Sequence, residues 1–559
     1  MALPGYRLLE GSEHAHPADH ALLGASDPAE SGTVTLLVRR RAGSKLLELT
    51  DFSGRPGEHP EPFSRADFAA QNGADPADIA QVEAFARGHG LTVVESDVAR
   101  RSVVVNGTVA SLNAAFGVAL HDYRSPRGKY RGYAGALSMP AGMAGVVEAV
   151  FGLDNRKVPA QHYAAKRKKV SASPETTNPP NTAPVTPQQI AALYGFPPGD
   201  GAGQTIGIYE METGDGPAGY TTQDLADSIA AFGGNLKVPK PVDVSVDGVT
   251  NSGKSDGETG LDITVAGAIA QGAELAVYFT GGDAQNIIHA LQLMFHPGAG
   301  DPQPTIVSIS YGWGPDDEAA AAFSAAEYAQ LDQLFQDAAN LGITVLVSSG
   351  DSGAFIESTT QAQASYPATE PWVIACGGTT VGNIAGASFD EYAWNNGGTG
   401  GASGGGISAR YPVPSYQSSL TLPVANGTKA AGRGIPDLAG NANEDSGYPQ
   451  FINGQSGPVG GTSAVAPLYA GLLAIVNANL GRAFGFINPI LYALAAQAFS
   501  DIVSPPGPAN NSYNGVTGYA VGAGWDAVTG LGSIKGTALQ AGLKAAPAPA
   551  TQPPVTAKP

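Results

Sequence analysis

The chain of 559 residues is too long for one ordinary domain, and its 43% hydrophobic content can supply at least two buried cores. Its 75 glycines and 42 prolines follow no collagen-like period and no solenoid repeat, which excludes a fibrous protein and indicates many turns. The formal net charge of -19 at pH 7 argues against a nucleic-acid partner, because phosphate binding needs clustered cations.

The net charge is confined to the C-terminal part of the chain. Residues 1–200 contain 20 Lys and Arg against 20 Asp and Glu, whereas residues 201–559 contain 10 against 29. Such an excess of carboxylates favours solubility. It also suits work at low pH, where many carboxylates are neutralised and their mutual repulsion is small.

Cysteine usage and hydropathy exclude further classes. The single cysteine, Cys376, excludes an intrachain disulfide. The first 25 residues lack the uninterrupted apolar core of a signal peptide. No stretch of about 18 apolar residues is expected to span a membrane. The sequence therefore predicts no membrane partner and carries no visible signal for export.

The N-terminal part of the chain alternates strand-like and helix-like patterns. This mixture is typical of a small α+β domain, which we expect over residues 1–163. The predicted strands are 33–38, 91–96, 101–107 and 118–123, and the predicted helices are 76–90 and 109–117.

A polar, proline-rich segment follows at residues 164–187 and includes the basic run Lys166 to Lys169. Such a segment is predicted to be an exposed linker that is easily cut. At the other end of the chain, residues 541–559 are rich in Pro and Ala and are expected to form a disordered tail.

Residues 188–540 alternate apolar, β-rich runs with helical segments, which predicts an α/β domain with a parallel sheet. Functional groups in such folds gather at the carboxyl ends of the strands. The predicted strands are 204–210, 273–279, 304–312 and 342–351.

Ser463 lies in the segment 460–481, just after a glycine-rich turn and at the start of an apolar helix with Pro467 in its first turn. The positive end of the helix dipole favours developing negative charge at such a hydroxyl. A serine in this position is most often an N-cap. The longer pattern G-T-S-A-x-A-P is much more specific and indicates a nucleophile.

A nucleophilic serine needs a base, and the usual one is histidine. His289 and His296 are the only histidines after residue 200, and both are interpreted as structural. Glu258 and Asp262 are spaced i and i+4, so they share one face of a helix opened by Ser255 or Asp256.

The remainder of that helix is Gly, Ala, Val, Ile and Leu, a buried composition in which paired carboxylates are costly without a purpose. A solvated acidic face is the alternative. Two close carboxylates share a proton, which makes one of them a base in acid and keeps the other protonated to orient it.

The apolar strand 342–351 ends at Asp351 in a glycine-rich turn. An aspartate in a turn commonly binds its own backbone. A protonated Asp351 is also able to donate a hydrogen bond to a tetrahedral oxyanion, which an ionised carboxylate cannot do. This chemistry again selects acid.

The motifs around Ser463, Glu258, Asp262 and Asp351 resemble those of the sedolisin family of serine-carboxyl peptidases, and the resemblance covers nearly the whole chain. It implies a subtilisin-like catalytic domain, with the glutamate at the place of the subtilisin histidine. It also implies a smaller prodomain similar to a ferredoxin-like fold.

The resemblance implies an acyl-enzyme on Ser463, with Glu258 as general base, Asp262 as its orienting partner and Asp351 as the acid of the oxyanion hole. Members of the family extend this hydrogen-bond chain through a further glutamate and a tryptophan. Glu210, at the end of the strand 204–210, matches the glutamate.

Tyr311 stands at the place of the family tryptophan. The resemblance also implies one structural calcium ion near the C-terminus, bound entirely by oxygen, which suits a hard cation. Two glycine-rich surface loops with incidental aspartates are the alternative. The implied ligands are the carboxylates of Asp501 and Asp526 and the backbone carbonyls of Ile502, Gly522 and Gly524.

In this family the prodomain covers the active-site side, and the enzyme removes the linker itself on acidification. The resemblance therefore implies a secreted, monomeric precursor that acts on proteins or peptides. We hypothesise that basic stretches such as Arg39 to Arg41 are attracted to the acidic catalytic domain until acid neutralises the carboxylates.

Two other functions fit parts of the sequence. Asp351 and Asp445 each begin a D-S-G triplet, as in pepsin-like aspartic peptidases, but Asp445 follows a polar loop and not an apolar strand. A catalytically silent relative that acts as a binding protein is the second alternative.

Overall fold

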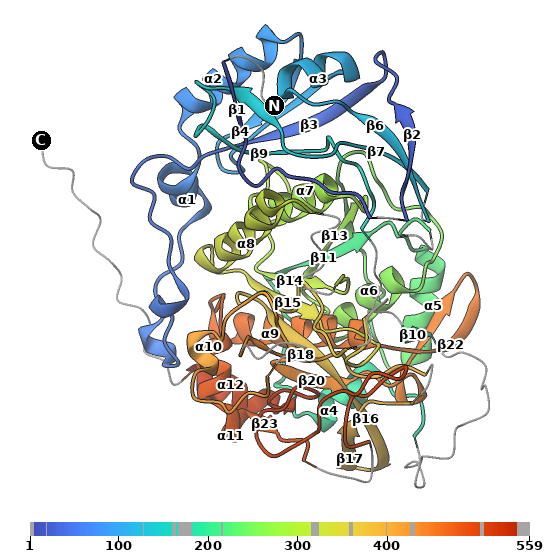
Figure 1. Ribbon diagram of the computed structural model, residues 1–559. Helices are drawn as coiled ribbons and strands as arrows, with labels where there is room; N and C mark the ends of the chain where they lie inside the picture. The colour runs from blue at the N-terminus through green and yellow to red at the C-terminus, as the bar shows by residue number, and fades with distance from the viewer. Residues whose placement is uncertain are drawn as a thin grey trace, which may run out of the picture.

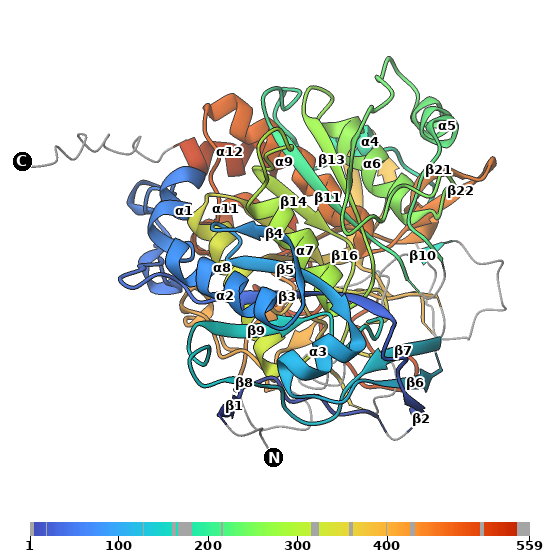
Figure 2. The same cartoon turned by 90° about the horizontal axis from the view of Figure 1, so that it is seen from above.

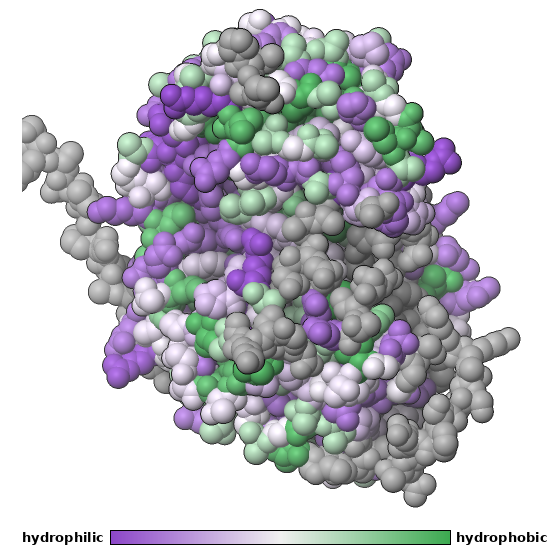
Figure 3. Space-filling model, viewed as in Figure 1, coloured by the Kyte–Doolittle hydropathy of each residue, from purple (hydrophilic) through white to green (hydrophobic). Residues whose placement is uncertain are grey.

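The computed structural model shows a small N-terminal domain seated on a larger C-terminal domain (Figures 1 and 2). On the face shown in Figure 3, hydrophilic and hydrophobic residues are intermixed over both domains. The described residues are 5–17, 19–126, 128–158, 164–165, 182–213, 216–314, 323–356, 361–397, 400–424, 431–503 and 508–544.

The N-terminal domain is built on a four-stranded antiparallel sheet in the order β4-β5-β3-β9. Helices α2 and α3 pack against this sheet, which confirms the predicted α+β class. The elements of the sheet layer are β3 (Ser31–Val38), β4 (Thr92–Asp97), β5 (Ser102–Thr108), β9 (Val147–Phe151), α2 (Pro76–Gly88) and α3 (Val109–Phe116).

Smaller elements complete this domain. A three-stranded sheet has the order β2-β6-β7, and β1 pairs with β8. Their bounds are β1 (Tyr6–Leu8), β2 (Ala21–Ala25), α1 (Arg65–Asn72), β6 (His121–Ser125), β7 (Gly128–Gly132) and β8 (Ser138–Pro140).

The C-terminal domain is built on an eight-stranded sheet in the order β12-β13-β11-β14-β15-β16-β17, in which β20 also pairs with β16. All its pairings are parallel except that of β16 with β17. The strands are β11 (Thr205–Met211), β12 (Val242–Ser245), β13 (Glu274–Thr280), β14 (Ile306–Ile309), β15 (Thr344–Ser348), β16 (Ile374–Ala385), β17 (Ser388–Ala393) and β20 (Leu438–Asn441).

Helices cover both faces of this sheet, as the predicted α/β class requires (Figure 1). Along β11, Ile206 and Ile208 belong to the core formed with one helix layer, while Tyr209 and Met211 belong to the other core. The first layer contains α4 (Pro187–Leu193), α5 (Thr222–Phe232), α6 (Glu258–Ile269) and α9 (Val465–Leu480), and the second contains α7 (Ala284–Phe295) and α8 (Ala325–Asn340).

The remaining elements are short. Helix α12 ends at Lys544, so residues 541–544 are helical and not part of the expected tail, while residues 545–559 lie outside the described part of the chain. These elements are β10 (Ala164–Ala165), β18 (Gly406–Ile407), β19 (Gly434–Ile435), β21 (Tyr448–Ile452), β22 (Gln455–Gly460), α10 (Asn488–Ala493), α11 (Ala495–Ala498), β23 (Phe499–Ser500), β24 (Ser533–Ile534) and α12 (Gly536–Lys544).

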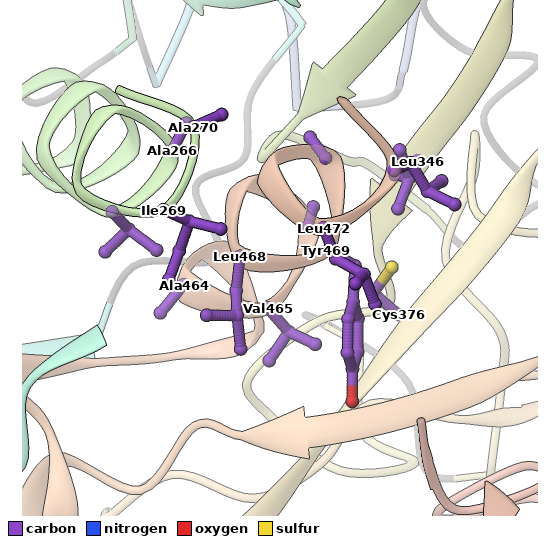
Figure 4. Close-up of a cluster of buried hydrophobic side chains, with 14 of the residues drawn as sticks. Ala266, Ile269, Ala270, Leu346, Cys376, Ala464, Val465, Leu468, Tyr469 and Leu472 are labelled. Carbon is purple, nitrogen blue, oxygen red and sulfur yellow. The ribbon is translucent and has the colours of Figure 1, made fainter. Parts of the chain in front are cut away.

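Helices α6 and α9 pack closely in the first layer (Figure 4). A Cβ atom at Gly471 would lie 2.7 Å from Cβ of Ile269, so this crossing needs a glycine. Ala266 and Ile269 of α6 lie beside the α9 residues Leu468 and Leu472 in the same core cluster. The crossing therefore lies at the last turn of α6, and α6 also contacts the short turn Thr462–Ala464 that leads into α9.

One prediction about hydropathy is corrected by helix α9. The segment Thr462–Leu480 is long and apolar enough to cross a membrane by length and composition, although no such stretch was expected. However, 83% of its most apolar window is buried inside the protein. This is the environment of a central core helix.

The two domains share a hydrophobic core and several polar contacts. Leu37 and Phe151 of the N-terminal sheet belong to the same buried cluster as residues of α7 and α8. Arg40 donates to Asp337 of α8 at 2.6 Å, and Thr35 is 2.8 Å from Nε2 of His289 on α7. The interface is therefore fixed by both burial and hydrogen bonding.

Only part of the predicted basic surface faces the C-terminal domain. Arg39 pairs with Asp78 of its own domain at 2.8 Å, and Arg41 donates to the backbone carbonyls of residues 70 and 74. Arg40 is the member of this run that pairs across the interface. The other basic run of the sequence, Lys166 to Lys169, lies outside the described residues.

The ion pair between Arg40 and Asp337 gives a test of the interface. Burial opposes ionisation of Asp337, but Arg40 and His296 together lower its pKa. A lowered pKa in the folded protein means that this stabilisation is complete above the unfolded pKa of about 4 and is lost as the pH falls through the lower folded value. Arg40→Met should therefore lower the unfolding free energy by about 3 kcal/mol at pH 7 and by less at pH 3.

Thermal and urea unfolding of the full chain at both pH values measure this difference. Arg39→Met is the matched control, because its partner Asp78 belongs to the same domain and the arginine is about half exposed. Equal losses in the two variants, or a loss in Arg40→Met that does not depend on pH, would contradict the prediction.

Candidate active site

Ser463 lies in a short 3-10 turn, Thr462–Ala464, that leads directly into α9. The preceding residue of the turn, Gly461, has φ 114, a conformation that glycine adopts without strain. The hydroxyl of Ser463 donates to the backbone carbonyl of Ser310 at 3.4 Å, and the residue is fully buried in the full-length chain. The helix start expected from the sequence is observed.

Glu258 and Asp262 lie on α6, one turn apart and both buried. The helix begins at Glu258 and its N-cap is Gly257 with φ 97, so the expected start at Ser255 or Asp256 is wrong. Asp256 still contributes, because its carboxylate accepts the backbone N–H of Thr259 at 2.9 Å.

Burial, followed by the nearby negative charges of Asp262 and Glu210, raises the pKa of Glu258 well above its usual value. The hydroxyl of Ser463 is near enough to oppose part of this rise. Within the described structure neither carboxylate oxygen of Glu258 has a hydrogen-bond partner of good geometry, and Oδ1 of Asp262 lacks one too. Acceptors buried without donors favour protonated carboxyl groups.

Ser310 connects the acidic helix to the nucleophile. Its hydroxyl donates to Oδ2 of Asp262 at 2.7 Å and lies 3.3 Å from the backbone carbonyl of Ser463. Ser310 was not among the residues predicted from the sequence. The available signal was its place directly after β14, at the carboxyl end of a parallel strand, where functional groups gather in such folds.

Glu210 is the last residue but one of β11 and is completely buried. Oε2 accepts hydrogen bonds from Tyr311 at 2.8 Å and from Thr259 at 3.0 Å. Burial, then the charges of Asp262 and Asp256, raise the pKa of Glu210 well above its usual value. The phenol of Tyr311 therefore reaches the glutamate that the family pattern joins to a tryptophan.

Asp351 follows β15 and is joined to the residue before Ser463. Its Oδ1 accepts the backbone N–H of Thr462 at 2.7 Å and the hydroxyl of Thr462 at 2.8 Å, while Oδ2 is buried and has no partner in the described part of the chain. Burial is the main cause that raises the pKa of Asp351 to about 8. When Asp351 is protonated, Oδ2 is the oxygen that is free to donate, because Oδ1 already accepts two hydrogen bonds.

The two histidines of the C-terminal domain face the N-terminal domain. Nδ1 of His289 lies 2.8 Å from Asp247, with Nε2 against Thr35, and Nε2 of His296 lies 3.2 Å from Asp337. These contacts support their interpretation as structural residues.

The residues expected to hold calcium lie on two adjoining loops. Oδ2 of Asp501 accepts the backbone N–H of Gly524 at 2.8 Å, and Oδ2 of Asp526 accepts that of Gly522 at 3.0 Å. Burial raises the pKa of Asp526 to about 6, so its ionised form lacks a compensating charge. Ile502 is buried directly after Asp501.

This arrangement fits a cation only in part. Among the described residues no group of three or more His, Cys, Asp and Glu side chains forms a metal cluster. A calcium ion here would need backbone carbonyls in addition to the two carboxylates, as the predicted donor set has. An ion would also compensate the buried charge of Asp526.

Comparison with known proteins identifies the two domains. Residues 19–156 match the family described as Pro-kumamolisin, activation domain, and residues 228–483 match the Subtilase family. The chain is 40% identical over 518 residues to kumamolisin of Bacillus sp. (strain MN-32), covering 91% of this chain and 90% of the relative.

Two further likenesses agree. The chain is 30% identical over 580 residues to tripeptidyl-peptidase sed5 of Aspergillus fumigatus, covering 94% of this chain and 96% of that one. The solved structure of Pseudomonas sedolisin, a serine-carboxyl proteinase complexed with two molecules of pseudo-iodotyrostatin, matches with TM-score 0.55 and 26% identity over 65% of this chain and 99% of that chain.

The fold and these likenesses define a serine-type peptidase with a subtilisin-like catalytic domain and an N-terminal prodomain. Within this class the chain belongs to the sedolisin family of serine-carboxyl peptidases, on its 40% identity to kumamolisin over 91% of its length. This membership runs against the pepsin-like alternative based on Asp351 and Asp445.

Proposed function

We propose that this protein is an acid-active serine-carboxyl endopeptidase made as a self-processing precursor. The observation that carries the proposal is the cluster of buried carboxyl groups beside Ser463, whose free oxygens have no donors in the described structure. A base that belongs to a proton-sharing cluster works where part of the cluster is protonated, which is in acid.

Glu258 is the proposed general base and Asp262 its orienting partner. In this mechanism Glu258 takes the hydroxyl proton as Ser463 attacks the carbonyl carbon of the peptide, and it returns the proton to the leaving amine. An acyl-enzyme forms, and water then attacks it by the same route. Asp262, held by Ser310, keeps the carboxyl of Glu258 oriented between these steps.

Asp351 is the proposed acid of the oxyanion hole. Its Oδ2 is free to donate when protonated, and Thr462 fixes the other oxygen by two hydrogen bonds. A neutral donor placed at the developing oxyanion stabilises the transition state more than the bound peptide.

The linker supports the proposal of self-processing. Ala164 and Ala165 form the strand β10, which pairs antiparallel with Gly460 and Val459. These two residues lie directly before Gly461 and the turn that contains Ser463. Extended peptides commonly bind by adding a strand in this way. The linker backbone is thus already held near the nucleophile, and its cleavage lies within the segment 164–187.

We further propose secretion and a monomeric state by likeness to the family.

Removal of the nucleophile or the base tests the mechanism. Ser463→Ala and Glu258→Gln should each lower the cleavage of an unfolded protein at pH 4 by about 10³-fold or more and should stop linker removal. Mass spectrometry of the precursor after acidification measures both effects and locates the processing site.

Glu274→Gln, an exposed glutamate at the start of β13, is the matched control and should keep full activity. Activity in Ser463→Ala that an aspartic-peptidase inhibitor abolishes would support the pepsin-like alternative. A parent protein that cleaves nothing at any pH would favour the silent binding protein.

The pKa of Asp351 sets a limit at high pH. Because burial raises this pKa to about 8, the donor proton is present below pH 8 and is lost above it. Asp351→Asn supplies an amide donor at every pH. The loss of kcat/KM that follows ionisation of Asp351 in the parent enzyme should therefore be absent from the alkaline side of the variant's pH profile. We expect kcat/KM at the optimum to fall by about 10- to 100-fold, because the amide is a poorer donor.

The full pH profile of the processed enzyme measures this effect, with Asp390→Asn at a partly exposed carboxylate of β17 as control. An alkaline limb that stays at the same pH in Asp351→Asn would remove Asp351 from this role.

A calcium ion bound by the loops of Asp501 and Asp526 is proposed to stabilise the catalytic domain. Chelation should lower the unfolding free energy by about 4 kcal/mol if calcium is normally present at 1,000 times its dissociation constant. Asp501→Asn should abolish this response while changing the calcium-free protein little, because Asp501 is exposed.

Thermal unfolding with and without chelator, together with metal analysis for one bound ion, tests the proposal. An identical melting temperature of the parent protein in calcium and in chelator would exclude a stabilising site.

A further inference from the structure

A fourth carboxyl group adjoins the cluster described above. Asp256 precedes α6, and it is partly exposed whereas Thr259 and Glu210 are completely buried. Its Oδ1 accepts the backbone N–H of Thr259 at 2.9 Å, and its Oδ2 accepts the backbone N–H of Gly219 at 3.2 Å. Asp256 is thus fixed at the point where the cluster meets solvent.

The hydroxyl of Thr259 joins Asp256 to Glu210. Its Oγ1 is 3.1 Å from Oδ2 of Asp256 and 3.0 Å from Oε2 of Glu210. A threonine hydroxyl has one hydrogen, so it can donate to only one carboxylate at a time. The second contact is a hydrogen bond only when the other carboxyl group carries a proton and donates it to Oγ1.

Beyond Glu210 the same shortage of donors continues to the base. Tyr311 supplies one hydrogen to Oε2 of Glu210, but Oε1 of Glu210 and Oδ1 of Asp262 have no donor among the described residues. Protons held by the carboxyl groups themselves are the remaining source of hydrogen bonds here. The protonation of Glu210 therefore bears on that of Asp262 and Glu258.

We propose that Asp256 is a positioning residue at the solvent side of the catalytic carboxyl cluster, and that the Thr259 hydroxyl couples its protonation to that of Glu210. This inference rests on the proposed function. In the coupled step the proton on Oδ2 of Asp256 passes to Oγ1 of Thr259 while the hydroxyl proton of Thr259 passes to Oε2 of Glu210. Asp256 ends ionised, Glu210 ends neutral and the hydroxyl is restored.

The charges around Asp256 agree with this coupling. Glu210 faces it from β11, Glu258 and Asp262 face it from α6, and Tyr311 faces it from the segment after β14. Gly219 contributes no charge, since it donates its backbone N–H to Asp256 and accepts the backbone N–H of Asp256. Lys254 on the near side is exposed.

Burial raises the pKa of Asp256 to about 6. Burial is also the main cause of the raised pKa values of Glu210, Glu258 and Asp262, and the charge of Asp256 adds to the rise in all three. Removing that charge lowers these pKa values, so each group then ionises at a lower pH.

The test is the pH dependence of kcat/KM for the enzyme that is obtained by processing of the full-length precursor. Asp256→Asn should move the acid limb to lower pH by about half a unit or more, because a negative neighbour is lost. Thr259→Val keeps the side-chain shape and removes the bridge, which raises the pKa of both Glu210 and Asp256. Both are then more often neutral, so the acid limb moves in the same direction.

The coupling itself is tested by the double variant. If the two residues act through one bridge, Asp256→Asn combined with Thr259→Val should move the limb little further than either change alone. Thr259→Ser keeps the hydroxyl and should return the limb to the parent position. Asp227→Asn, which removes a carboxylate from the surface of α5, is the control for a simple change of net charge.

The outcomes separate this inference from the proposed function. Suppose that the parent is active in acid, but that Asp256→Asn and Thr259→Val leave the limbs of the pH profile in place, even with reduced kcat. This result overturns the inference alone, since a merely structural role changes activity without moving the profile. Additive shifts overturn the bridge. A parent without acid activity overturns both proposals. If Asp256→Asn does not fold, the acid limbs of Thr259→Val and Thr259→Ser are compared instead. A shift in Thr259→Val alone supports the inference, and no shift in either variant overturns it.

Discussion

The constraint on which the active site depends is a shortage of hydrogen-bond donors around buried carboxyl groups. Glu258 has two oxygens without a donor in the described structure, and Glu210 and Asp262 have one each. Fully ionised, such a cluster would place several negative charges in a medium of low dielectric constant. The cluster is more stable when its members hold protons, and this is the physical basis of the proposed activity in acid.

Burial in the catalytic domain keeps solvent from relieving this constraint, because Glu210, Glu258 and Asp262 are all completely buried. Helices α6 and α9 also cross closely where Ile269 meets Gly471, which leaves no room for a side chain at that glycine. The parallel sheet supplies the other wall, with Glu210 and Ser310 at the ends of β11 and β14. The side-chain donors to Glu210 and Asp262 are the hydroxyl groups of Thr259, Tyr311 and Ser310, which can also accept hydrogen bonds and which add no charge.

The sequence predicted the local structure around the candidate site better than the contacts within it. The pattern around Ser463 and the i, i+4 spacing of Glu258 and Asp262 report local structure, and both are observed. The true start of α6 was missed, because the φ of 97 at Gly257 depends on the surrounding fold. The bridge from Ser310 to Asp262 joins residues 48 positions apart, so no local pattern reveals it. The same holds for Arg40, the member of the run Arg39 to Arg41 that forms an ion pair across the interface, because the run looks uniform in sequence.

The two kinds of carboxyl group in the precursor respond to acid in a definite order. The pKa values of the active-site carboxyl groups are raised, chiefly by burial, whereas that of Asp337 at the interface is lowered by Arg40 and His296 against the effect of burial. As the pH falls, the site gains its protons while the pair of Arg40 with Asp337 is still intact. On the proposed mechanism the catalytic residues therefore become competent while the prodomain is still bound, and the nearest peptide is then the linker strand beside Gly460. Cleavage within the same molecule before the prodomain dissociates follows from this order.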